Sequence, residues 1–67
     1  MIARDEGRPL CRLVGTDGNV FAIIGKVQQV LRNAGQHERA TEFVRRAFAA
    51  GSYDAVLQLC FEYVEVE

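Results

Sequence analysis

The sequence predicts a single α+β domain that is mostly α: a strand, three helices and a short C-terminal strand, with the two strands forming a two-stranded antiparallel ribbon. Three observations predict it. Apolar residues recur at helical spacing in three segments that glycines separate, an apolar run follows Pro9, and the last four residues alternate between valine and glutamate. A chain of 67 residues has the length of one small domain, 1–67.

The first strand should occupy residues 10–14. Residues 1–8 are mostly polar, so we expect a flexible terminus there. Proline lacks an N–H group and is tolerated at the edge or the first position of a strand, so the strand begins after Pro9. The sequence GTDGN that follows predicts a turn, with Asp17 or Asn19 available to cap the next helix.

The first helix should run over residues 20–34 and stop at Gly35, because glycine readily adopts the left-handed conformation that ends a helix. Gly25 lies inside this segment, where glycine costs about 1 kcal/mol relative to alanine. We therefore expect another backbone or a ring to approach closely at Gly25. The apolar residues on one side of this helix are Val20, Ile23, Val27, Val30 and Ala34, with Ile24 and Leu31 beside them and Phe21 at the flank.

Two more helices should follow. The second covers residues 37–50 and ends at Gly51, and Ser52 is a good N-cap for the third. The apolar residues of the second helix that follow helical spacing are Ala40, Phe43, Val44, Ala47 and Phe48. Those expected to be buried in the third helix are Val56, Leu57, Cys60 and Phe61.

The C-terminal residues 64–67 read VEVE, an alternation that is typical of a strand. In an antiparallel pair with the first strand, both valines would join Cys11 on the buried face, together with Leu13. The glutamates at 65 and 67 would then oppose Arg8 and Arg12 on the outer face, where opposite charges stabilise strand pairing.

The two cysteines, Cys11 and Cys60, are too few and too widely spaced for a zinc site. In a reducing cytosol we expect both to pack inside as small apolar residues. The alternative is a Cys11–Cys60 bridge between the first strand and the last helix, which the sequence alone does not test.

We predict no catalytic, cofactor-binding or metal-binding residue, and therefore no enzyme. His37 stands beside Glu38 with no pattern of partners for a metal site or a catalytic triad, so we expect a surface histidine. The segment GTDGN lacks the repeated acidic ligands of a calcium loop and the spacing of the phosphate-binding loops. A turn followed by a helix cap is the expected role of these residues.

The charge and the N-terminal residues indicate a cytoplasmic protein without a membrane partner. Eight basic and nine acidic residues give a formal net charge of −1, so the chain has no global field that would attract DNA or anionic lipid. The first seven residues include Arg4, Asp5 and Glu6 where the apolar region of a signal peptide would begin. No apolar run reaches membrane-spanning length.

Two segments carry a resemblance to other proteins. The run LVGTDGNVFAIIGKVQQVLRNAG and the closing YDAVLQLCFEYVEVE resemble a family of short, uncharacterised bacterial and phage- or plasmid-borne proteins that share a DGN turn, a following apolar helix and a VEVE-like ending. The resemblance implies one compact unit over most of the chain after Pro9. It implies no activity and no catalytic residue.

The function we expect is that of a small non-enzymatic protein-interaction or regulatory module, which forms a homodimer or binds another protein. Three apolar helix faces on so short a chain offer more surface than one small core covers, which favours association. The aromatic residues expected to divide between the core and an interface are Phe21, Phe43, Phe48 and Tyr53.

The alternative is a helix-turn-helix-like nucleic-acid-binding protein that uses the second helix. Its candidate contacts are Arg39, Arg45 and Arg46. Glutamates are interleaved with these arginines and would be repelled by phosphates, and DNA binding needs several uncompensated basic contacts. This charge argument disfavours nucleic acid as a partner.

Overall fold

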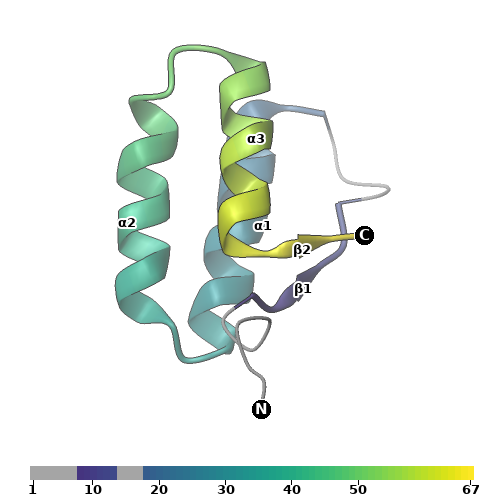
Figure 1. Cartoon of the computed structure of the whole chain (residues 1–67), viewed down its shortest axis with the longest axis vertical. Coiled ribbons are helices and arrows are strands. Elements are labelled where there is room, and N and C mark those ends of the chain that lie inside the picture. The colour runs from purple at the N-terminus through teal and green to yellow at the C-terminus, as the bar shows by residue number, and fades with distance from the viewer. Residues whose placement is uncertain (1–7, 14–17) are drawn as a thin grey trace.

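Three helices make up most of the fold, and a short β-ribbon lies beside the last turn of the third (Figure 1). The structure is a computed structural model that describes residues 8–13 and 18–67. The elements in chain order are β1 (Leu10–Cys11), α1 (Val20–Asn33), α2 (His37–Phe48), α3 (Tyr53–Tyr63) and β2 (Glu65–Val66). The flexible terminus expected before residue 8 and the turn residues 14–17, Asp17 included, lie outside the described residues.

The ribbon is parallel, so the predicted antiparallel pairing is wrong. Leu10 pairs with Glu65 and Cys11 pairs with Val66. The Glu65 N–H donates to the carbonyl oxygen of Pro9 at 3.0 Å, which places the beginning of β2 beside the beginning of β1. Antiparallel pairing is the usual result of a short hairpin, whereas three helices connect these strands, and a long crossover allows parallel pairing. The fold is therefore mostly helical with one small parallel pair.

The predicted faces of the ribbon are nevertheless correct. Cys11 and Val64 are fully buried, and Leu13 and Val66 pack against the core. On the outer face Arg8 Nη2 lies 3.8 Å from Glu65 Oε2, and Arg12 Nη2 lies 3.6 Å from Glu67 Oε1. Alternation along a strand assigns each side chain to a face whichever way the partner strand runs, so these charges share the outer face in either direction, and the direction decides only which arginine meets which glutamate.

The helix ends follow local rules that the sequence predicts. The Asn19 side chain accepts a hydrogen bond from the Phe21 N–H at 2.7 Å, and the Ser52 hydroxyl oxygen accepts one from the Ala55 N–H at 3.1 Å. Gly35 has a φ of +81°, and the N–H of the next residue, Gln36, donates back to the Leu31 carbonyl at 2.9 Å. These contacts end α1 and begin α3 within one residue of the predicted positions. The α2 helix ends at Phe48, two residues before the predicted end at residue 50.

One hydrophobic core joins all five elements, and Phe43 is the largest fully buried side chain in the part of the chain that the structure describes. Its ring meets the Tyr63 ring edge to face, with centroids 5.4 Å apart. The buried apolar residues are Cys11, Ile23, Ile24, Val27, Leu31, Ala40, Phe43, Ala47, Val56, Leu59, Cys60, Tyr63 and Val64.

The side of α3 that faces this core differs from the prediction. Leu59 and Tyr63 are buried in place of Leu57 and Phe61, and Phe61 is 57% exposed. Apolar residues occupy most of the circumference of α3, so spacing alone does not select the buried side. The consequence is an apolar residue, Phe61, in contact with solvent.

The close approach expected at Gly25 is absent among the described residues. Apart from its chain neighbours and the backbone of α1, no described atom lies within 4 Å of the position that a Cβ atom on Gly25 would take, and the residue is exposed. The helix therefore carries a glycine that local packing does not require.

Replacing this glycine should stabilise the protein. We expect Gly25→Ala to raise the free energy of unfolding by about 1 kcal/mol, because alanine is the better helix former and the site has room for a methyl group. Urea unfolding followed by circular dichroism measures the change. A destabilised Gly25→Ala variant would show that glycine is needed there.

The C-terminal strand should contribute more than its length suggests, since Val64 is fully buried. We expect deletion of residues 64–67 to lower the free energy of unfolding by at least about 2 kcal/mol, from the lost Val64 burial and ribbon hydrogen bonds. The control is the double variant Glu65→Gln, Glu67→Gln, which removes only exposed ion pairs and should cost less than about 1 kcal/mol. Equal losses in the two proteins would contradict a structural role for the strand.

Candidate apolar docking site

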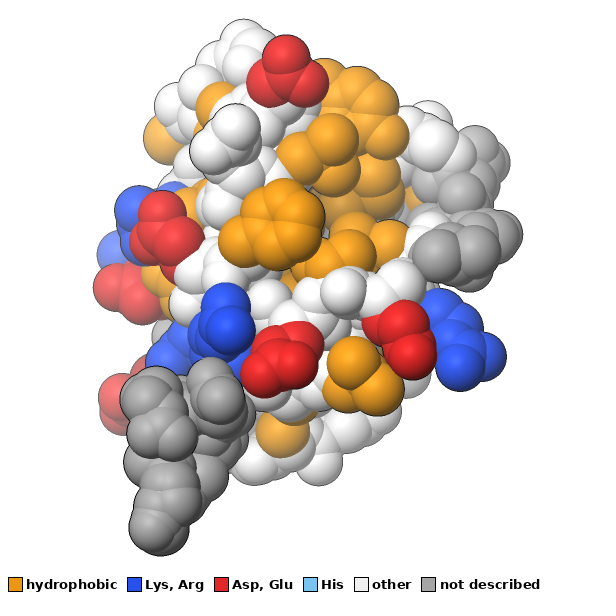
Figure 2. Space-filling view, turned by 45° about the vertical axis from the view of Figure 1, so that its right-hand side comes forward, with side chains coloured by type: hydrophobic (Ala, Val, Ile, Leu, Met, Phe, Trp, Pro, Cys, Tyr) orange, Lys and Arg blue, Asp and Glu red, His pale blue; other side chains and the backbone are white. Residues whose placement is uncertain are grey.

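Three exposed aromatic side chains gather where α1 begins, α2 ends and α3 begins. Phe21 is 64% exposed, Phe48 61% and Tyr53 46%. They border a hollow of about 300 Å³, which we call the aromatic groove. Its lining residues are Val20, Phe21, Ile24, Ala47, Phe48, Gly51, Ser52, Tyr53 and Val56. Figure 2 shows hydrophobic side chains collected at this end of the molecule.

The helix caps position the rim of the aromatic groove. Phe21 directly follows the first residue of α1, and its own N–H is held by the Asn19 cap. Phe48 is the last residue of α2 and Tyr53 the first of α3, so the short turn through Gly51, with a φ of +87°, sets their relative position. The Phe21 and Phe48 rings lie with centroids 5.9 Å apart at 39°, a tilted pair.

Buried residues form the floor of the groove. Ile24, Ala47 and Val56 are each 3–4% exposed and belong to the hydrophobic core. The floor is therefore as rigid as the core itself, while the rim consists of side chains that contact solvent. Such a site can accept an apolar side chain without rearranging the backbone.

The four aromatic residues predicted to divide between core and interface differ in exposure, and their role in an interface stays a prediction. Phe43 is fully buried in the core, at the α2–α3 contact, whereas Phe21, Phe48 and Tyr53 lie together around the groove. Two further exposed apolar residues, Leu10 and Phe61, were not among the predicted site residues. The sequence predicts Phe61 to be buried, because its spacing in α3 matches that of a core residue.

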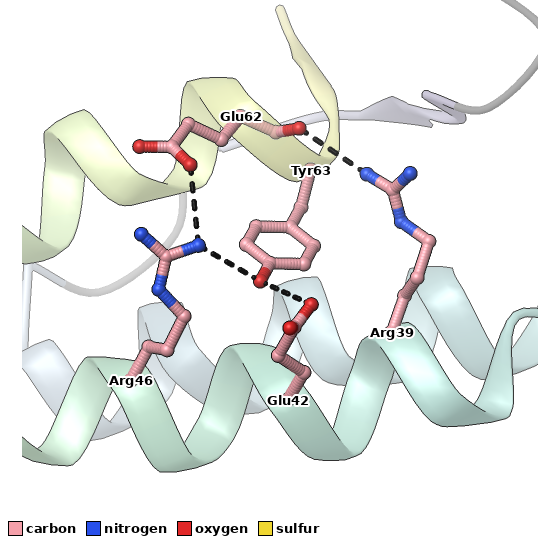
Figure 3. Close-up of polar contacts among 5 residues, drawn as sticks. All are labelled: Arg39, Glu42, Arg46, Glu62 and Tyr63. Carbon is pink, nitrogen blue, oxygen red and sulfur yellow. Dashed lines mark hydrogen bonds and ion pairs between the residues drawn. The ribbon is translucent and has the colours of Figure 1, made fainter.

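A polar network at the α2–α3 contact involves two of the three candidate arginines (Figure 3). The Tyr63 hydroxyl donates to Glu42 Oε1 at 2.7 Å and accepts from Arg46 Nη1 at 3.1 Å. Arg46 Nη1 also donates to Glu62 Oε1 at 3.2 Å, and Arg39 Nη2 donates to the Glu62 carbonyl oxygen at 3.2 Å. Burial and the hydrogen bond to Glu42 both raise the Tyr63 pKa, so the phenol stays protonated at neutral pH.

The two guanidinium groups also flank the Tyr63 ring. The Cζ atoms of Arg39 and Arg46 lie 5.0 and 5.8 Å from its centroid, and Figure 3 shows one arginine on each side. The spacing of Arg39, Glu42 and Arg46 on one face of α2 is the sequence signal for such a network. Arg45 is exposed and has no part in it. The three arginines therefore do not form one open basic surface.

Both cysteines are buried free thiols and therefore form no bridge. Burial, followed by the charge of the neighbouring Cys11 thiolate, raises the Cys60 pKa to about 11. Burial also raises the Cys11 pKa, although the charge of Lys26 opposes it. A nucleophilic cysteine acts as a thiolate, so neither residue is poised for chemistry at neutral pH.

Metal ligands and membrane spans were also predicted to be missing, and residues 8–13 and 18–67 bear on both. No group of three or more His, Cys, Asp and Glu side chains in these ranges is arranged to hold a metal ion. His37 is exposed at the first position of α2. Nor is any helix within these ranges both long and apolar enough to cross a membrane.

No protein-family model, curated protein or solved structure matches the chain. A function for this protein therefore has to be argued from its own residues. The resemblance to short bacterial and phage- or plasmid-borne proteins stays a prediction. At the aromatic groove three exposed aromatic side chains border one hollow.

The buried thiol predicts a loss of stability in alkali. The unfolded Cys60 titrates near its usual pKa of 9.0, whereas the folded thiol titrates near 11, so the unfolded state binds fewer protons between these values. Stability is therefore unaffected below pH 9 and falls as the pH rises toward 11, by up to about 3 kcal/mol from this group. Urea unfolding at pH 7, 9 and 10.5 measures the fall.

The control for this experiment is Cys60→Ala. We expect this variant to be less stable at pH 7 but to lose less stability on going to pH 10.5, since the Cys60 contribution is gone while those of Cys11 and Tyr63, whose pKa values are also raised, remain. An equal loss in Cys60→Ala and the natural sequence would contradict a contribution from the Cys60 thiol.

Proposed function

We propose that this protein is a non-enzymatic protein-interaction module that docks an apolar side chain of a protein partner in the aromatic groove. One observation carries the proposal: Phe21, Phe48 and Tyr53, about half to two-thirds exposed, surround a hollow whose floor is buried core. Aromatic residues, phenylalanine and tyrosine included, are enriched in protein–protein interfaces relative to the rest of a protein surface.

The chemistry of the groove supports binding rather than catalysis. Among its described lining residues the only ionisable side chain is that of Tyr53, and the polar ones are limited to Tyr53 and Ser52. The groove thus offers apolar contact area and two hydroxyl groups, but no acid–base pair. A partner would gain affinity by removing the aromatic rings from water.

The arginines of α2 give less support to the alternative, nucleic-acid binding. Arg39 and Arg46 already contact Tyr63 and Glu62, and a phosphate would have to replace those contacts. Arg45 alone supplies too little uncompensated charge for a salt-sensitive complex. We therefore keep protein binding as the function.

The proposal predicts that short apolar peptides bind the groove. The protein, tethered sparsely so that copies do not meet, is used to select binders from a random library of seven-residue displayed peptides. We expect enrichment of peptides with aromatic or aliphatic residues, and at least tenfold weaker binding of these peptides to Phe48→Ser. That loss corresponds to about 1.4 kcal/mol, a modest value for one interface aromatic.

The matched control is Phe61→Ser. Phe61 is as exposed as Phe48 but lies outside the groove, so this variant should bind the selected peptides unchanged. The proposal fails if no peptide is enriched, or if the selected peptides bind Phe48→Ser as well as they bind the natural sequence. Circular dichroism and a cooperative urea transition confirm that each variant is folded.

A further inference from the structure

We infer that the partner of the aromatic groove is a second copy of this chain, packed with its α3 antiparallel to α3 of the first about a two-fold axis. In this homodimer the C-terminal end of α3 of each copy, which carries Phe61, packs into the aromatic groove of the other copy. The inference rests on the proposed function and adds the identity and orientation of the partner.

The groove is one end of a longer apolar strip along α3. Tyr53, Leu57 and Phe61 follow one another at four-residue spacing, on a side of the helix different from the one that Leu59 and Tyr63 bury. A helix with apolar residues on opposite sides is typical of an element covered on both. In the described structure Leu57 is half-buried and packs against the core, whereas Tyr53 and Phe61 at the two ends of the row are about half exposed.

The outer face of the ribbon adds one exposed apolar side chain, Leu10, among the ion pairs Arg8–Glu65 and Arg12–Glu67. Leu10 is 60% exposed, and the Arg8 guanidinium donates to the Phe61 carbonyl oxygen at 2.7 Å, which ties the start of β1 to the end of α3. Figure 2 shows a few more hydrophobic side chains below the main group, with acidic and basic side chains around them. The apolar surface along α3 therefore has the aromatic groove at its Tyr53 end and the exposed side chains of Phe61 and Leu10 at its other end.

This asymmetry makes the strip complementary to itself. A two-fold axis that passes near Leu57, close to the middle of α3, reverses the helix and places Phe61 of each copy at the groove of the other. The contact then occurs twice and closes the assembly as a dimer, as isologous interfaces do. Each copy supplies both the groove and its occupant.

The charges at the two ends agree with this orientation. Asp54 is exposed in the first turn of α3, at the groove end, and Arg8 lies at the opposite end, where it is held 3.8 Å from Glu65. Antiparallel packing brings Asp54 toward the Arg8–Glu65 ion pair of the other copy, which has no net charge, whereas parallel packing brings Asp54 toward Asp54, a repulsive contact. With a net charge of −1, two copies repel each other little as a whole.

The available area is also sufficient. A stable interface removes roughly 800 Å² from each partner, which is about a fifth of the 4290 Å² accessible surface of this chain. An aromatic side chain presents roughly 150 to 250 Å², and Phe21, Phe48, Tyr53 and Phe61 are about half to two-thirds exposed. These four residues alone supply about half of the required area, and Leu10, Leu57 and the flank of α3 extend it.

Sedimentation equilibrium of the full chain tests the inference first. We expect a dimer at tens of micromolar, and at least a tenfold higher dissociation constant for both Phe48→Ser and Phe61→Ser. A mixture of these two variants should associate more tightly than either variant alone, because the mixed dimer keeps one contact with both phenylalanines intact. In parallel packing Phe48 would meet Phe48 and Phe61 would meet Phe61, so each single variant would keep one contact intact. The mixed dimer would then lack one phenylalanine in both contacts, and mixing would not strengthen association.

Crosslinking tests the position of the axis. Gln58 is exposed next to Leu57, so Gln58→Cys should be joined to its copy by a short bismaleimide, whereas Gln29→Cys, on exposed α1 surface outside the strip, should not. The native thiols are buried and are shielded from the reagent. Crosslinking of Gln29→Cys but not of Gln58→Cys would overturn the inference.

The outcomes separate the two proposals. A chain that stays monomeric, or a dimer that Phe61→Ser leaves unchanged, overturns the inference, while the binding of short peptides to the groove still supports the proposed function. If Phe48→Ser changes neither peptide binding nor association, both proposals fail.

Discussion

The edge-to-face contact between Phe43 and Tyr63 is the constraint on which the rest of the structure depends. Phe43 is the largest fully buried side chain of the described residues, and Tyr63 ends α3, so their contact sets how α3 is rotated against α2. That rotation buries Leu59 and turns Phe61 outward. It also directs the next residue, Val64, into the core, from which the chain enters the ribbon.

The small size of the domain explains why apolar surface is left over. A chain of 67 residues buries a smaller fraction of its surface than a larger domain does, and a single core offers few interior positions. Once Phe43 and Tyr63 occupy the α2–α3 contact, the remaining aromatic side chains lie at helix ends and on the outer side of α3. The same packing that stabilises the fold thus produces the surface proposed for binding.

The polar groups of the α2–α3 contact follow from the same geometry. Tyr63 brings a hydroxyl group to the edge of the core, and Glu42 and Arg46 satisfy it. Arg39 and Arg46 pack on both sides of the ring, so their charges serve the helix contact. Exposed ion pairs such as Arg46–Glu62 contribute little stability, but here they orient side chains that would otherwise be free to meet phosphates.

The sequence by itself determined the features that neighbouring residues create: the caps at Asn19 and Ser52, the stop at Gly35, and the inward and outward faces of the ribbon. Tertiary structure alone decided the direction of β2, the buried side of α3, the open space at Gly25 and the meeting of three aromatic residues at one groove. Caps and alternation depend on contacts within a few residues. The direction of a strand and the rotation of a helix depend on where distant segments fill the core.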